Sequence, residues 1–242
     1  MDYQHDNCRV SLEQLGTSTK QDGWVGAWVI NACCRKIFKD NHPRFSNKHF
    51  FFHTSAEYFL EKWPSDYMKN VWNNNVIKNF KAADSAKKLH QSERLNFPSL
   101  YDNHWFVFAV DMRARKFLFL DSLYGETSTL HQKVDNMMIT NFINTWNKCN
   151  LKDMHFESFG RMFPNLPKQK TRNDCGIFTI KYMQKYCTRN PHSCLFSAQD
   201  IPESRVRVAI DTLFNDYNSE ISQMDFISTF DIQAYKNKKR NM

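Results

Sequence analysis

The residues best suited to chemistry surround Cys175. Asn173 and Asp174 precede it, and an apolar run over residues 177–186 follows that is long enough to form a buried helix. Asn and Asp are helix-capping residues, so the sequence predicts side-chain capping and places Cys175 in the first helical turn. There the unpaired N–H groups and the positive end of the helix dipole favour a thiolate. The pattern therefore predicts a cysteine nucleophile.

A base and its partner are predicted on a hairpin upstream of this cysteine. Two strand-like segments begin at His104 and end at Asp121, with a polar turn between them. A turn centred between Met112 and Arg113 would place His104 directly opposite Asp121, with Cβ atoms about 5 Å apart. That separation suits a carboxylate that orients an imidazole through its ring N–H.

Gln169 is the predicted oxyanion donor. It lies six positions before Cys175, on a loop that also contains Pro164 and Pro167. Its amide and the Cys175 backbone N–H would together stabilise a tetrahedral intermediate, with about 3 kcal/mol for each donor.

Each of these residues also has an ordinary structural interpretation. A lone helical cysteine is usually inert core, and a lone strand histidine is usually a satisfied structural residue. Asp121 alone would suit a turn, Gln169 a solvated loop, and Trp105 a buried core position. The conjunction of His104, Asp121, Gln169 and Cys175 favours a catalytic site over these separate alternatives.

Taken together, the motifs resemble the catalytic domain of the ubiquitin-like-protein-specific cysteine proteases, the group that contains the SUMO proteases. The resemblance extends from about Trp24 to Asn218. Its motifs are Gly23 to Asn31, Phe50 to Thr54, Asn103-His104-Trp105, Leu120 to Leu123, and Gln169 with Asp174-Cys175-Gly176.

The resemblance implies hydrolysis after the terminal Gly-Gly of a modifier, SUMO first among the candidates. The bond is either the peptide bond of a precursor or an isopeptide bond to lysine. Cys175 would attack, His104 would transfer the proton and Asp121 would orient His104, with no cofactor. Alternatives are a protease for ubiquitin or another ubiquitin-like modifier, and a non-catalytic modifier-binding or nucleic-acid-associated domain of the same fold.

Two tryptophans complete the implied site. Trp24 and Trp105 would flank a narrow tunnel that admits only a tail without side chains. Many family members carry an acidic residue three positions after the first tryptophan, where this chain has Ala27. This departure leaves the identity of the modifier open.

The periodicity predicts an α+β, papain-like fold, with a small central mixed or antiparallel sheet flanked by helices. One catalytic domain is expected over residues 21–220, between a flexible segment at 1–20 and a C-terminal extension with a basic tail at 221–242. Helices are expected near residues 24–39, 54–63, 69–90, 131–147, 175–187 and 203–217.

Composition constrains the cellular setting. The 242 residues include seven cysteines without paired spacing, which favours reduced thiols in the nucleus or cytoplasm. The sequence has neither an apolar run of about 20 residues nor a signal peptide, so a soluble intracellular monomer is expected. Cys187, His192 and Cys194 fit no zinc pattern, and no metal site is predicted.

The formal net charge of +8 predicts acidic partners. No nucleic-acid-binding motif accompanies the charge, so specific nucleic-acid binding is not expected. Lys168 and Lys170, near the cysteine, would suit an acidic modifier surface, although a solvated basic face is the simpler interpretation.

Overall fold

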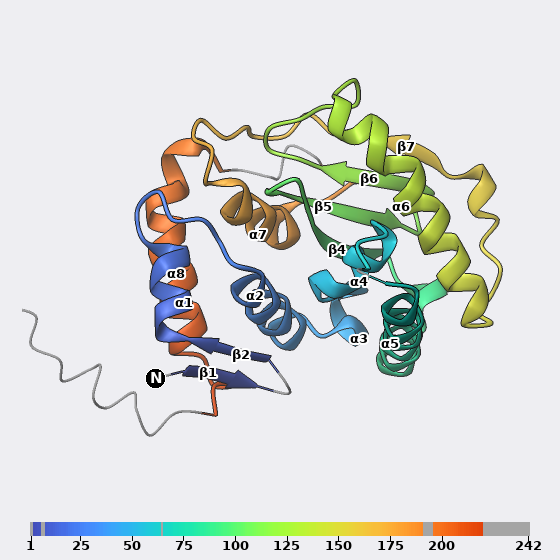
Figure 1. The fold of residues 1–242 in the computed structure, drawn as a ribbon, viewed down its shortest axis with the longest axis horizontal. Helices are drawn as coiled ribbons and strands as arrows, with labels where there is room; N and C mark the ends of the chain where they lie inside the picture. The colour runs from blue at the N-terminus through green and yellow to red at the C-terminus, as the bar shows by residue number, and fades with distance from the viewer. Residues whose placement is uncertain (1, 6–7, 64, 191–195, 220–242) are drawn as a thin grey trace, which may run out of the picture.

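The computed structural model describes residues 2–5, 8–63, 65–190 and 196–219 (Figure 1). Its α-helices are α1 Leu12–Thr19, α2 Ala27–Asp40, α3 Pro43–Ser46, α4 His53–Phe59, α5 Asp66–Ala86, α6 Thr129–Lys148, α7 Cys175–Lys185 and α8 Ile201–Leu213. Its strands are β1 Asp2–His5, β2 Cys8–Ser11, β3 Lys48–Phe50, β4 Arg94–Tyr101, β5 His104–Asp111, β6 Lys116–Leu120 and β7 Gly160–Met162. Short 3-10 helices cover Leu89–Gln91, Phe156–Ser158 and Ala198–Asp200.

Within the described residues, a five-stranded mixed sheet has the order β3-β4-β5-β6-β7. The central strands β4, β5 and β6 pair antiparallel, while β3 and β7 join the two edges in parallel. The structure confirms the predicted α+β class with a small mixed sheet flanked by helices.

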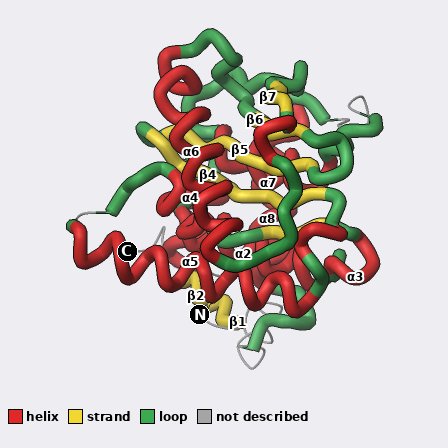
Figure 2. Tube along the Cα trace, turned by 90° about the vertical axis from the view of Figure 1, so that its right-hand side faces the viewer, coloured by secondary structure: helices red, strands yellow, loops and turns green. Residues whose placement is uncertain are grey.

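Strand β5 divides the core into two halves, because successive side chains point to opposite faces of a sheet. Trp105, Val107 and Ala109 pack with α2 and α7, whereas Phe106 and Phe108 pack with α4, α5 and α6. The sheet therefore lies between two helical layers (Figure 2). All eight residues of β5 are buried, so His104 begins a strand whose position is fixed on both faces.

The predicted helices are all present in the described residues, with ends displaced by a few residues. The expectation of a flexible segment over residues 1–20 is wrong for the part that is described. Strand β2 and helix α1 place Cys8, Val10 and Leu15 in the core. A capping box starts α1, in which the Ser11 hydroxyl accepts from the Gln14 N–H and the Gln14 side chain accepts from the Ser11 N–H. The segment is short and largely polar, so its composition does not predict this packing.

The hairpin that carries His104 and Asp121 differs in register from the prediction. Asp111 pairs with Lys116 across a four-residue loop. The Asp111 carboxylate accepts from the Ala114 N–H at 2.7 Å, and Arg115 takes the left-handed conformation with φ 55°, which stabilise the longer turn. Extending this register puts Asp121 opposite Phe106, two positions away from His104. Because the slip is even, both side chains still lie on the same face.

A tight turn fixes the other end of β5. Tyr101 pairs with His104 across the two-residue turn Asp102-Asn103, whose φ angles are 49° and 58°. Two successive positive φ angles match the twist of antiparallel strands, and Asp and Asn tolerate this conformation well. The turn therefore places His104 at the first position of β5, at the end of the sheet.

Candidate active site

Cys175 is the first residue of α7 and is 1% exposed. The predicted side-chain capping of this helix is wrong. Asp174 is the N-cap, but its backbone is helical (φ −87°, ψ −10°), whereas capping side chains need an extended backbone. Its carboxylate instead accepts from Arg205 at 2.7 Å and from the Thr171 hydroxyl at 2.5 Å. The Cys175 end of α7 consequently keeps its N–H groups clear of a capping side chain.

Arg205 connects the cysteine loop to the N-terminal part of the chain. Besides Asp174, its buried guanidinium donates to the carbonyl oxygens of Ser18, Gly23 and Asn173, at 2.7 to 3.0 Å. Charged groups buried this deeply are stable only when their hydrogen bonds are made. Arg205 therefore holds together three segments that lie far apart in the sequence.

Gly176 allows the segment that carries Trp24 to approach α7 closely. A Cβ atom on Gly176 would lie 2.5 Å from the Cβ of Val25, closer than any normal contact. The carbonyl of Val25 also accepts a hydrogen bond from the Trp105 indole at 2.9 Å. The chain before α2 is thus held directly beside the cysteine helix.

The structure brings Cys175, His104 and Asp121 together, as predicted. His104 Nε2 lies 2.8 Å from Asp121 Oδ1, and the His104 side chain also hydrogen-bonds the Cys175 thiol. Burial alone would lower the pKa of His104, but its bonds with Asp121 and Cys175 outweigh burial and raise the pKa to about 9. The raised pKa keeps the imidazole protonated, and an imidazolium stabilises a neighbouring thiolate.

The Asp121 carboxylate is almost fully buried, at 2% exposure. Burial would raise its pKa, but hydrogen bonds with His104 and His131 hold that pKa well below its usual range. The backbone N–H groups of Leu123 and Tyr124 also donate to Oδ1, at 2.7 and 2.8 Å. The carboxylate is therefore an anion with a fixed orientation.

His131 was not predicted to belong to the site. Its Nε2 lies 2.9 Å from Asp121 Oδ2. In the sequence it is a single histidine near the start of a helix, ten positions after Asp121, with no motif around it. Only the packing of α6 against the sheet shows the contact.

Gln169 lies in the site with its side chain fixed. Its Oε1 accepts from the Ser122 hydroxyl at 2.5 Å, and its Nε2 donates to the Thr171 carbonyl at 2.8 Å. An amide nitrogen carries two N–H groups, so one N–H remains for a ligand. Gln169 and His104 line the same pocket.

The two predicted tunnel tryptophans are in contact with each other. Their ring centroids are 6.1 Å apart at an angle of 33°, and Trp105 is fully buried. A peptide between two indoles needs about 3.5 to 4.0 Å on each side, so no gap for a tail separates these rings. Trp105 points into the core because it alternates with His104 along β5. It supports Trp24, which faces the pocket, and does not itself form a wall.

A pocket of about 690 Å³ lies over His104. The pocket is formed by the turn after β4, the loop after β6 and the loop before α7, together with Trp24. His104 lies between this pocket and the buried Cys175. Its lining residues are Trp24, Asp102, Asn103, His104, Leu123, Tyr124, Gln169, Lys170, Thr171, Arg172 and Asn173. The arrangement fits a nucleophilic cysteine with an adjacent base, an orienting carboxylate and oxyanion donors.

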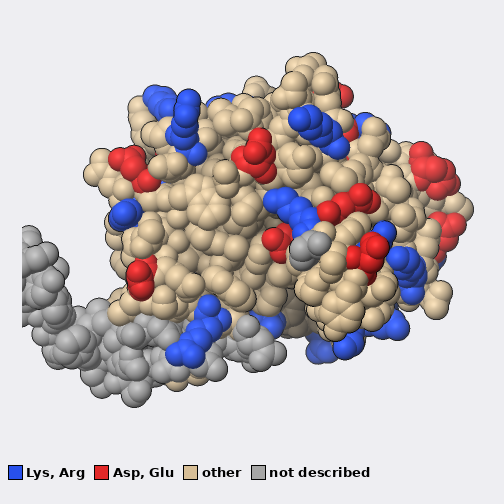
Figure 3. All heavy atoms as spheres, in the orientation of Figure 1, with Lys and Arg blue, Asp and Glu red and all other residues tan. Residues whose placement is uncertain are grey.

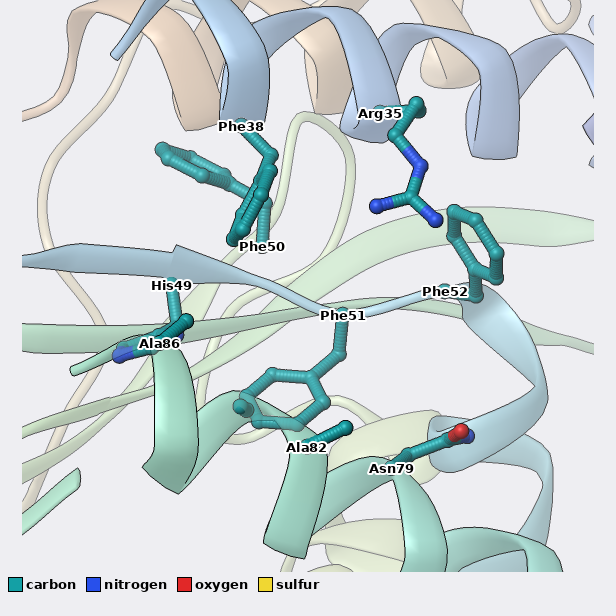
Figure 4. A pocket seen from close by; sticks show the side chains of 10 residues that line it. Arg35, Phe38, His49, Phe50, Phe51, Phe52, Asn79, Ala82 and Ala86 are labelled. Atoms are coloured by element: carbon teal, nitrogen blue, oxygen red, sulfur yellow. The ribbon is translucent and has the colours of Figure 1, made fainter. Parts of the chain in front are cut away.

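A separate cavity of about 220 Å³ lies between α2, β3 and α5. Figure 4 shows the Arg35 guanidinium entering it from α2, opposite Phe51 and Ala82. None of Cys175, His104 and Asp121 lines this cavity.

Among the described residues, no cluster of three side chains suitable for a metal ion is found. Of the three residues considered and rejected as metal ligands, Cys187, His192 and Cys194, the last two lie outside the described residues.

Comparison with known proteins agrees with this geometry. The family model of the Ulp1 protease family, C-terminal catalytic domain, matches residues 24–238. The chain belongs to the Ulp1 protease family. This membership confirms the resemblance seen in the sequence motifs, and the match contains all of the site residues described above.

Relatives within the family include two proteins of Arabidopsis thaliana. A putative ubiquitin-like-specific protease 1B is 26% identical over 219 residues, which cover 87% of this chain and 60% of the relative. The ubiquitin-like-specific protease ESD4 is 25% identical over 213 residues, which cover 87% of this chain and 41% of the relative. The chain thus spans about half the length of these curated relatives.

Solved structures of the family share the fold. The C-terminal Ulp1 protease domain in complex with Smt3, the yeast ortholog of SUMO, has a TM-score of 0.63 at 15% identity and covers 88% of this chain and 87% of its own. The SUMO protease Ulp1 with its catalytic cysteine oxidised to a sulfenic acid has a TM-score of 0.66 at 15% identity, with 86% of each chain covered. These similarities confirm the papain-like α+β fold.

Proposed function

We propose that this chain is a cysteine peptidase that cleaves after the C-terminal Gly-Gly of a ubiquitin-like modifier, with SUMO as the first candidate. The observation that carries the proposal is the continuous contact from Cys175 through His104 to Asp121 beneath a pocket, in a chain of the Ulp1 family. Relatives named as ubiquitin-like-specific proteases, and the Smt3 complex of Ulp1, support this substrate class.

The reaction follows from the positions of the side chains. The Cys175 sulfur attacks the carbonyl carbon of the terminal glycine while His104 carries the proton. His104 then protonates the departing amine, the C–N bond breaks, and a thioester remains on Cys175. Water, deprotonated by His104, hydrolyses the thioester. Asp121 keeps the imidazole oriented and stabilises its charged form.

The negative oxygen that forms in each step needs donors. The backbone N–H of Cys175 lies at the N-terminus of α7, where helical N–H groups and the helix dipole favour an anion. Gln169 contributes the N–H that is not bonded to Thr171. We propose these two groups as the oxyanion site, without a cofactor.

The modifier itself is tested with a panel of probes. Full-length SUMO, ubiquitin and related modifiers carrying a C-terminal electrophile are incubated with the chain, and adducts on Cys175 are identified by peptide mass spectrometry. We expect capture by a SUMO-type probe. Capture by ubiquitin alone would replace SUMO with the alternative modifier, and no adduct with any probe would contradict the protease proposal.

Trp24 and Trp105 have separable expected effects. Trp24→Ala removes a half-buried wall of the pocket and should raise KM about tenfold for a Gly-Gly substrate. Trp105→Phe keeps the buried bulk but leaves the Val25 carbonyl without its donor, which should lower the free energy of unfolding by about 1 to 3 kcal/mol. Steady-state kinetics and chemical denaturation distinguish the two. An unchanged KM in Trp24→Ala would exclude Trp24 from substrate binding.

The net positive charge does not form one patch on the face shown in Figure 3. Lysine and arginine side chains are interspersed there with aspartate and glutamate. The face shown therefore carries no single-sign basic stripe of the kind that binds nucleic acid. A nucleic-acid-associated domain and a non-catalytic binding module stay as alternatives, and catalytic turnover of a probe substrate would exclude the second.

We propose that the protein acts as a monomer in the nucleus or cytoplasm. The cysteines described as free thiols are Cys8, Cys33, Cys34, Cys149, Cys175 and Cys187. Unpaired thiols, one of them a nucleophile, are typical of reducing compartments. None of the described helices has the length and apolar character needed to cross a membrane.

A further inference from the structure

Asp121 lies between two histidines, and the proposed reaction uses only one of them. Its Oδ1 meets His104 and the N–H groups of Leu123 and Tyr124. Its Oδ2 meets His131 Nε2 at 2.9 Å, the one hydrogen bond to this oxygen among the described residues. Without His131, an anionic oxygen would be buried with no donor, which is strongly unfavourable.

The His131 ring lies in an apolar environment. The residue is fully buried, and its ring meets Phe106, Phe119 and Phe163 with centroid distances of 5.0 to 5.4 Å. Its Nδ1 has no hydrogen-bond partner in the described part of the chain. A carboxylate accepts hydrogen bonds and does not donate them, so Nε2 of His131 carries the hydrogen of this contact.

The backbone of His131 is also fixed. Ser128 caps α6, and its hydroxyl accepts from the His131 N–H at 3.2 Å. The ring and the main chain are therefore held independently, one by Asp121 and one by the helix cap. This anchors the start of α6 to the end of β6, where Asp121 lies.

We propose that His131 is a positioning residue that donates from Nε2 to Asp121 and holds Oδ1 of that carboxylate toward His104. A donor on Oδ2 stabilises the carboxylate and fixes its rotation, which leaves Oδ1 facing His104. The charged and titratable groups around Asp121 are His104 from β5, His131 from α6 and Lys168, whose Nζ donates to the Asp121 carbonyl at 2.9 Å. The inference rests on the proposed roles of Cys175, His104 and Asp121.

The test compares His131→Gln, His131→Asn and His131→Phe. Glutamine carries an N–H at about the reach of Nε2, asparagine is one methylene shorter, and phenylalanine fills the space without a donor. Two quantities are measured on the full chain: turnover of a modifier substrate, and the alkylation rate of Cys175 by iodoacetamide at pH 6 relative to pH 10. That ratio reports how much His104 contributes to thiolate formation at low pH, because pH 10 lies above the ordinary pKa of a cysteine thiol, about 8.5.

We expect His131→Asn and His131→Phe to lower both the alkylation ratio and kcat by about 10- to 100-fold, with KM nearly unchanged. His131→Gln should recover most of both. His49→Phe is the matched control, since His49 is also a buried histidine with one ring nitrogen, Nε2, that has no partner among the described residues, and it lies on the edge strand β3 beside α5 (Figure 4). It should lower the melting temperature and leave the ratio unchanged.

A native alkylation ratio in both His131→Asn and His131→Phe would overturn the inference. So would an alkylation ratio and a kcat in His131→Gln that are no higher than those of His131→Asn. Where His131→Phe does not fold, the comparison of Gln with Asn decides. The alkylation arm needs no modifier. Native protein that turns over no modifier would therefore contradict the proposed function, while the ratio still tests the position of His131.

Discussion

Replacing Cys175 with alanine is expected to lower turnover of a modifier substrate by on the order of 10⁶-fold, since the proposed nucleophile is lost. The change removes one sulfur from a buried site at the start of α7, so the melting temperature should change little. Binding of the modifier should persist, because Trp24, Gln169 and the pocket loops are untouched. Release of a fluorophore from a Gly-Gly terminus measures turnover, and calorimetric titration measures binding.

Cys33→Ala is the matched control for this variant. Cys33 lies in the same core cluster, and burial, with a smaller contribution from Cys8, raises the pKa of its thiol to about 12. It is therefore a protonated packing residue, and its loss should reduce stability without reducing turnover per folded molecule. Full activity in Cys175→Ala would exclude the nucleophile, and loss of modifier binding would show that Cys175 is needed for packing.

Replacing Asp121 with asparagine is expected to lower kcat by on the order of 10²- to 10⁴-fold, less than His104→Ala. Asparagine keeps the size of the side chain but removes the charge that raises the pKa of His104 to about 9. The pKa of His104 should fall toward its ordinary value of 6.5, and the basic limb of the kcat/KM profile should move to lower pH. A full pH profile of native and variant protein measures the shift.

The same pair predicts how stability depends on pH. The raised pKa of His104 contributes stability that is present below pH 6.5 and is lost as pH rises through about 9. The lowered pKa of Asp121 contributes stability that is present above pH 3.8 and is lost as pH falls below that value. In Asp121→Asn the loss of stability at high pH and the loss at low pH should both become smaller. Melting temperatures measured from below pH 3.8 to above pH 9 check this.

Asp135→Asn is the control for the charge change. Asp135 is also buried and accepts from Arg161 at 2.7 Å, on the same helix as His131 but away from Cys175. Asp135→Asn should lower the free energy of unfolding and leave the basic limb of the kcat/KM profile at its native pH. A native basic limb in Asp121→Asn would show that Asp121 does not set the protonation of His104.

Local sequence signals were sufficient for several features of this protein. Helical periodicity gave each of the predicted helices, and the alternation of strand residues placed His104 and Asp121 on one face even though the assumed turn centre lay one residue too early, which shifts the strand pairing by two residues. That error did no harm, because side chains in a strand repeat with a period of two. The resemblance carried by short motifs likewise identified the family, since Cys175, His104, Asp121 and Gln169 lie within them.

Other features depended on contacts between distant segments, which local patterns do not encode. The carboxylate of Asp174 seemed a helix cap, but Arg205 from α8 binds it. Trp105 seemed a tunnel wall, but the alternation of β5 buries it beneath Trp24. His131 carried no motif at all, and its contact with Asp121 exists because α6 packs across the same face of the sheet. Sequence periodicity thus determined which face each strand residue occupies, while tertiary packing decided which partner it meets there.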